Sequence, residues 1–147
     1  MLHSTLRTTL LCALAVTACG DDDGSEPLPD AVVTIVYTPN PIPWSAGPGT
    51  TQTCASAPNV WRFSAVFTES AGTGVSLTSV SNVVDGVSQP ALTIALSIPA
   101  LGSGTLLREL CFTAATQHTL QSTFTGTDEE GRSVSFSGPQ VTLSAQP

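Results

Sequence analysis

The chain has 147 residues, and its four Lys and Arg against eleven Asp and Glu give a formal net charge of −7. Such an acidic surface repels nucleic-acid phosphates and anionic lipid head groups, so we expect no nucleic-acid partner. The hydrophobic content of 41% suits a globular chain that can build a core.

The first residues have the layout of a secretory signal. Arg7 stands in a short basic region, and an uncharged apolar run covers residues 10–16 before small residues follow. A helix that crosses a bilayer needs roughly twenty apolar residues, and an acidic run begins here soon after Cys19. We therefore predict a removable signal rather than a transmembrane anchor.

Val16, Thr17, Ala18 and Cys19 resemble the lipobox of bacterial lipoproteins: an aliphatic residue, two small residues and a cysteine. The resemblance implies that residues 1–18 are the signal peptide and that lipid on Cys19 holds the protein to a membrane. Acyl chains contribute about 0.8 kcal/mol for each buried methylene, which makes such an anchor firm. An ordinary signal peptide with a chance cysteine is the alternative.

Residues 19–30 form a predicted flexible acidic tether, because they contain like charges and prolines without apolar periodicity. In enteric lipoproteins an aspartate directly after the lipidated cysteine favours the inner membrane. Gly20 occupies that position here, so the resemblance favours the cell envelope at the outer membrane. Asp21–Asp23 offer oxygens for calcium, but a solvated tether is the preferred interpretation.

Trp44 lies in a proline-rich segment that favours extended geometry. An exposed indole there could contact a sugar ring or a protein partner. The preferred interpretation is that Trp44 plugs one end of the fold, because so large an apolar side chain is usually buried.

The remaining chain, residues 31–147, shows period-two alternation interrupted by turn residues, and no sustained helical spacing. On the strand around Trp61, the residues Trp61, Phe63, Ala65 and Phe67 share one face. Leu92, Ile94, Leu96 and Ile98 share one face of a later strand, and Asp85 with Gly86 predicts a tight hairpin turn. The predicted strands cover residues 31–38, 60–70, 75–84, 91–98, 105–114, 118–127 and 132–144, the last as one strand or a broken pair.

About seven short strands predict an all-β domain, an antiparallel two-sheet sandwich. The stretches "VTIVYTPNP", "WRFSAVFTESAGTGVSLTS" and "FTGTDEEGRSVSFSGPQVTL" resemble immunoglobulin-like or fibronectin type III-like modules. Trp61 follows Cys54 too closely for the antibody pattern, and Tyr37 lies in the first strand. We therefore expect no antibody-type disulfide between the sheets.

Cys54 and Cys111 remain once Cys12 is assigned to the signal and Cys19 to the lipid. In an oxidising envelope we predict that they form a disulfide. A two-cysteine metal site is the alternative, and it lacks further ligands because His118 is the only histidine after the signal.

The sequence offers no catalytic constellation. His118 has no nucleophile motif around it and is interpreted as a surface or edge residue. Asp128–Glu130 are interpreted as a solvated hairpin tip rather than a calcium site. We expect no enzyme activity, no cofactor and no metal.

Two functions remain. The preferred one is a membrane-anchored, non-catalytic binding or spacer module with an unidentified protein or carbohydrate ligand. The alternative is a structural accessory of an envelope assembly that pairs through an exposed edge strand.

Overall fold

The computed structural model describes residues 26–147, and all regular elements in this part of the chain are β-strands. In chain order they are β1 (Val33–Thr38), β2 (Trp44–Ser45), β3 (Asn59–Glu69), β4 (Val75–Val84), β5 (Val87–Ser88), β6 (Leu92–Ile98), β7 (Ser103–Phe112), β8 (His118–Asp128), β9 (Ser133–Ser137) and β10 (Val141–Leu143).

The predicted all-β class is confirmed, with ten strands rather than about seven. The difference comes from short pieces: β2 and β5 have two residues each. The last predicted strand is the broken pair β9 and β10, since Gly138 and Pro139 stand between them and proline cannot donate to a ladder.

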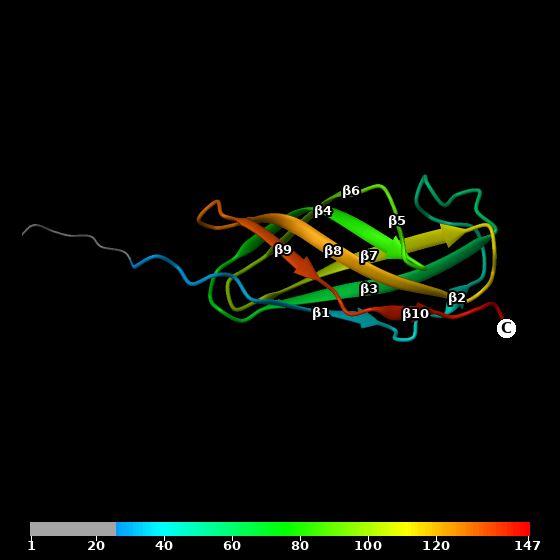
Figure 1. Ribbon diagram of the computed structural model, residues 1–147, viewed down its shortest axis with the longest axis horizontal. Helices are drawn as coiled ribbons and strands as arrows, with labels where there is room; N and C mark the ends of the chain where they lie inside the picture. The colour runs from blue at the N-terminus through cyan, green and yellow to red at the C-terminus, as the bar shows by residue number, and fades with distance from the viewer. Residues whose placement is uncertain (1–25) are drawn as a thin grey trace, which may run out of the picture.

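The strands form two antiparallel sheets (Figure 1). In the first sheet β3 is central: β7 pairs along one of its edges, and β1 and β2 pair one after the other along its other edge. In the second sheet β8 pairs along one edge of β4, and β5 and β6 share the other. Strands β9 and β10 occupy the free edge of β8. The result is a sandwich with four edges.

The core lies between the sheets and confirms the predicted face of β3. Trp61, Ala65 and Phe67 are fully buried and Phe63 is nearly so. Phe67 meets Phe124 of the opposite sheet edge to face, with ring centroids 4.8 Å apart, a geometry that aromatic pairs favour. The buried apolar residues all fall between Ile35 and Leu143, so this part of the chain contains its own complete core.

The predicted hairpin turn after β4 is present. Asp85 and Gly86 have φ values of 50° and 79°, and Val84 pairs with Val87 across them. Two successive residues in the left-handed region are what a type I′ hairpin requires, and Asp-Gly adopts that conformation readily.

The chain enters the sandwich at the end formed by the β3–β4 and β8–β9 turns (left in Figure 1). Arg132 donates to the carbonyls of Leu28 and Pro29 at 3.1 and 2.9 Å, and the Thr73 hydroxyl donates to Pro29 at 2.6 Å. Contacts with the domain thus begin at Leu28, within the stretch predicted to be a tether.

Candidate functional site

The two long sides of the sandwich differ. On one side, Ile42 forms a bridge with Leu143 that joins the segment after β1 to β10 of the other sheet. The Ile42 amide donates to Thr142 at 2.8 Å, and the Ser144 amide donates back to Ile42 at 2.8 Å. Backbone hydrogen bonds therefore close this side.

The opposite side lies between β6 and β7, and it opens along its length. Ile98 at the end of β6 is 1% exposed, whereas Leu92 at its start is 46% exposed. Ile94 and Leu96 are half-buried. The predicted apolar face of β6 is real, but its burial decreases toward Leu92 because β6 is an edge strand that nothing covers at that end.

The opening is a cleft of about 420 Å³. Its apolar lining includes residues of both sheets: Val84, Leu92, Ile94, Leu106, Leu110 and Phe112. The polar residues of the lining include Asn82, Gln89, Thr93, Arg108 and Glu109. A mainly apolar cleft of this size with a few polar groups is typical of sites for small molecules.

Arg108 is the unusual residue of the cleft. In β7 it belongs to the inward-facing series with Leu106 and Leu110, and it is only 9% exposed. Within residues 26–147 its guanidinium has no ion-pair partner and no hydrogen bond. Burial lowers the pKa of its guanidinium, and the Coulombic interaction with Tyr37 opposes this. Its nitrogens are not among the fully buried polar atoms of residues 26–147 that lack a partner, so the guanidinium still reaches solvent in the cleft. A cation that has lost much of its hydration and has no counter-ion favours an anion beside it.

Further polar side chains lie in the same part of the interior. The Ser122 hydroxyl donates to Asn82 Oδ1 at 2.8 Å, and both residues are buried. The buried Tyr37 hydroxyl has no hydrogen-bond partner among the described residues. Burial raises the pKa of Tyr37, while Ser122 and Arg108 nearby act in the opposite direction. The Tyr37 hydroxyl is thus a buried donor without an acceptor, and it does not line the cleft.

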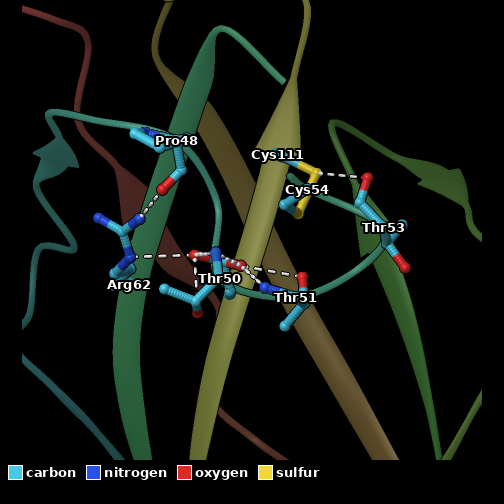
Figure 2. The surroundings of a disulfide bond; sticks show 8 residues. Pro48, Thr50, Thr51, Thr53, Cys54, Arg62 and Cys111 are labelled. Carbon is cyan, nitrogen blue, oxygen red and sulfur yellow. Dashed lines mark hydrogen bonds and ion pairs between the residues drawn. A yellow bond between two sulfur atoms is a disulfide. The ribbon is translucent and has the colours of Figure 1, made fainter. Parts of the chain in front are cut away.

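The predicted disulfide between Cys54 and Cys111 is confirmed, with Cα atoms 5.6 Å apart. Cys54 lies in the long loop between β2 and β3, and Cys111 lies in β7 (Figure 2). The bridge joins a loop to a strand and does not connect the two sheets, as expected from the departure from the antibody pattern. Disulfides are typical of oxidising, extracytoplasmic compartments.

A buried carboxylate also fastens this loop. Glu109 accepts hydrogen bonds from the backbone amides of Thr50 and Thr51, the latter at 2.8 Å. It also forms an ion pair with Arg62, whose Nε lies 2.9 Å from a carboxylate oxygen. Burial raises the pKa of Glu109, but these hydrogen bonds outweigh it and hold the pKa at about 2. Arg62 also donates to the Pro48 carbonyl (Figure 2). Thr51, Thr53 and Cys54 line the cleft, so the loop forms a fixed part of its rim.

His118 is not the surface residue that the sequence suggested. Its ring packs against Trp61 and Phe112, with centroid distances of 5.7 and 4.6 Å, and its side chain is 13% exposed. Nδ1 lies 2.6 Å from Asp85 Oδ2. The hydrogen bond from His118 is the main reason why the pKa of the Asp85 carboxyl lies below its ordinary value. The ring joins β8 to the β4–β5 turn.

The interpretation of Asp128–Glu130 as a solvated tip is wrong for Asp128. Its side chain is 1% exposed and pairs with Arg132 at 2.6 Å. Burial raises the pKa of Asp128, but the hydrogen bonds from Arg132 outweigh it, so that the pKa lies below its ordinary value. In residues 26–147 no three His, Cys, Asp or Glu side chains are grouped so as to hold a metal ion.

Trp44 lies in β2, half-buried, and its indole N–H donates to Asn59 Oδ1 at 3.2 Å. It pairs with Trp61 on the edge of β3 opposite β7, so the structure separates Trp44 from the cleft. Cys19 lies outside the described residues.

Arg108 is the candidate site residue that the sequence analysis missed. A weak signal was available, because Arg108 interrupts the alternating series Leu106, Leu110 and Phe112. Leu107, adjacent to Leu106, obscures this alternation, and it is 80% exposed in the structure. Because apolar residues occur on both faces of this strand, the sequence did not show whether the Arg108 side chain points into the core or to solvent.

No family model matches the sequence, and no curated protein matches it significantly. Among solved structures, ApaA of Bordetella pertussis is similar, with a TM-score of 0.52, 11% identity, and coverage of 79% of this chain and 94% of that chain. The CARDB domain of PF1109 from Pyrococcus furiosus, solved in complex with di-metal ions, gives a TM-score of 0.46, 17% identity, and coverage of 80% and 88%. The likeness to ApaA supports the sandwich fold alone.

Proposed function

We propose that this chain is a lipid-anchored, non-catalytic module of the bacterial cell envelope that binds a ligand in the β6–β7 cleft. The observation that carries the proposal is the placement of the two ends of the sandwich. The chain enters at one end, fastened by Arg132, and the Cys54 loop lies at the other end (Figure 1). Lipid on Cys19 would therefore direct the disulfide end away from the membrane.

Two observations support an envelope location. The disulfide indicates an extracytoplasmic compartment. Residues 16–19 resemble a lipobox, which supplies the anchor. In residues 26–147 there is no helix long and apolar enough to span a membrane. Gly20 after Cys19 favours the outer membrane over the inner one.

The residues around the cleft support a binding role rather than catalysis. His118, the histidine that could have served as a base, is not among the residues that line the cleft. The polar groups of the lining, among them Arg108, Asn82 and Gln89, suit recognition of a ligand. The rim is held by the disulfide and Glu109, so the site is preorganised, which lowers the entropic cost of binding.

The anchor is tested with Cys19→Ser in a bacterial host that processes lipoproteins. We expect loss of labelling by a radioactive or clickable fatty acid, accumulation of the uncleaved precursor, and loss of the mature protein from the outer-membrane fraction. Cys12→Ser, inside the predicted signal, is the matched control and should retain all three properties. Labelling of the Cys19→Ser protein at the wild-type level would overturn the anchor.

A second candidate function is pairing with a partner strand in an envelope assembly. The observation that favours it is the free edge of β7, a ten-residue strand whose one partner among the described strands is β3. Exposed edges of this length recruit other strands unless charges protect them. Under this alternative, Thr105→Lys, on the exposed face of β7 and outside the cleft lining, should abolish co-purification of a partner from envelope extract, whereas a cleft-binding module should keep its ligand.

A further inference from the structure

Arg108 occupies a position that calls for a bound anion. It is nine-tenths buried and lines the cleft, and its guanidinium forms no ion pair or hydrogen bond within the described chain. The other two arginines of this region behave differently. Arg62 pairs with Glu109 at 2.9 Å and Arg132 pairs with Asp128 at 2.6 Å. In residues 26–147, only the arginine that faces the cleft lacks a carboxylate.

The chemistry around Arg108 limits the kind of anion. One guanidinium presents a planar fork that matches a single carboxylate. Glu109, whose carboxylate is paired with Arg62, also lines the cleft. This negative charge and the formal net charge of −7 disfavour multivalent anions. Asn82 and Gln89, which also line the cleft, provide side-chain amides that can donate to the same ligand. These features favour a monocarboxylate.

The walls of the cleft select the rest of the ligand. Leu106 and Leu110 flank Arg108 on β7, and Ile94 and Leu92 face them from β6. Leu92 is 46% exposed, so an apolar ligand that covers it gains hydrophobic contact. Aliphatic walls on both sides and a volume of about 420 Å³ suit one small hydrocarbon chain.

We propose that the β6–β7 cleft binds an aliphatic monocarboxylate, with its carboxylate on Arg108 and its hydrocarbon chain between Leu106, Leu110 and Ile94. The inference deepens the proposed binding function by naming the ligand class. It does not depend on the lipid anchor, because the cleft lies wholly within the domain that contains its own core.

The test uses octanoate and the oxidised domain Gly20–Pro147, titrated by calorimetry at low ionic strength. Octanol, which has the same chain without the charge, should bind at least about tenfold more weakly, since the charge-assisted hydrogen bonds are lost. Acetate, which has the charge without the chain, should also bind at least about tenfold more weakly. These comparisons use the unaltered protein, so they hold even where a variant fails to fold.

Arg108→Gln should weaken octanoate binding at least about tenfold and remove the preference over octanol. Thr105→Ala is the matched control, because Thr105 lies on the same strand, is exposed and does not line the cleft; its affinity should stay within about twofold of wild type. Near-ultraviolet circular dichroism verifies that each variant is folded.

Absence of octanoate binding by the folded wild-type domain would overturn the proposal, and so would equal binding of octanoate and octanol. Unchanged affinity in a folded Arg108→Gln variant would do the same. A failed titration combined with normal lipid labelling of Cys19 would leave the anchored module intact and remove only its ligand. Octanoate binding together with failed labelling would remove only the anchor.

Discussion

The backbone N–H of Leu101 donates a hydrogen bond of 2.9 Å to the carboxylate of Glu69, which joins the end of β3 to the turn between β6 and β7. The same carboxylate accepts from the amides of Ala71, Gly72 and Val32 at 2.8, 2.9 and 3.2 Å. Glu69 is 1% exposed. One buried charge therefore holds three loop segments at the end where the chain enters.

Glu69→Gln should destabilise the domain by about 3 kcal/mol, because the buried amides lose charge-assisted acceptors and face a new NH₂ donor. Chemical denaturation of the oxidised domain measures this. Glu26→Gln, at an exposed carboxylate, is the control and should change the free energy of unfolding by less than about 0.5 kcal/mol. A loss in Glu69→Gln no larger than that of the control would contradict the role of this residue.

Stability should depend on pH through Glu69 and Glu109. Each has a folded-state pKa of about 2 against an ordinary value of 4.5, so the unfolded chain binds more protons between these values. Their contribution to stability is fully present above about pH 4.5 and is lost as the pH falls toward about 2. Denaturation midpoints measured from pH 7 to 2 should fall through this window.

The same pH series identifies the groups responsible. Glu69→Gln and Glu109→Gln should each flatten the decline, whereas Glu26→Gln should follow the wild-type curve. If all three variants retain the wild-type slope, other carboxyls cause the acid sensitivity.

Reduction of the Cys54–Cys111 bridge should lower the free energy of unfolding by about 2 to 5 kcal/mol, because the reduced chain regains the freedom of a long loop. The two cysteines are 57 positions apart. In mass spectrometry, the mass of the exported protein should be lower than that of the reduced form by two hydrogens. The exported protein should not react with an alkylating reagent before reduction. A Cys54→Ala/Cys111→Ala variant should be insensitive to reductant. Two readily alkylated thiols in protein taken from the envelope would contradict the pairing.

Gly126→Ala should destabilise the domain by about 2 to 4 kcal/mol. Gly126 faces the register shift of β4 between Leu77 and Ser79, and a Cβ atom there would overlap the Ser76 carbonyl oxygen. Because this obstacle is backbone, a rotamer change cannot relieve it. The control is Thr127→Ala at the next, exposed residue, which should lower the free energy of unfolding by less than about 1 kcal/mol. Equal denaturation midpoints for the two variants would show that the strand adjusts at no cost.

The local sequence pattern was sufficient to predict those features that depend on neighbouring residues or on a single possible pairing. The alternation around Trp61 predicted a strand with one buried face, and Asp85 with Gly86 predicted a turn that needs positive φ. Both depend on the period of a strand and on the backbone freedom of individual residues. The pairing of Cys54 with Cys111 followed by elimination, once a signal and a lipid were assigned to the other two cysteines.

Long-range packing decided what the sequence could not. The alternation of β6 indicates an apolar face, but how deeply Leu92 is buried depends on what lies opposite, and there the sandwich is open. Asp128 in an acidic turn looks solvated until Arg132 folds over it. Glu69 and Arg108 have equally ordinary sequence contexts, yet tertiary contacts surround one carboxylate with donors and leave one guanidinium without an acceptor. Burial and the pairing of buried charges arise between segments far apart in the chain, so local composition and periodicity do not determine them.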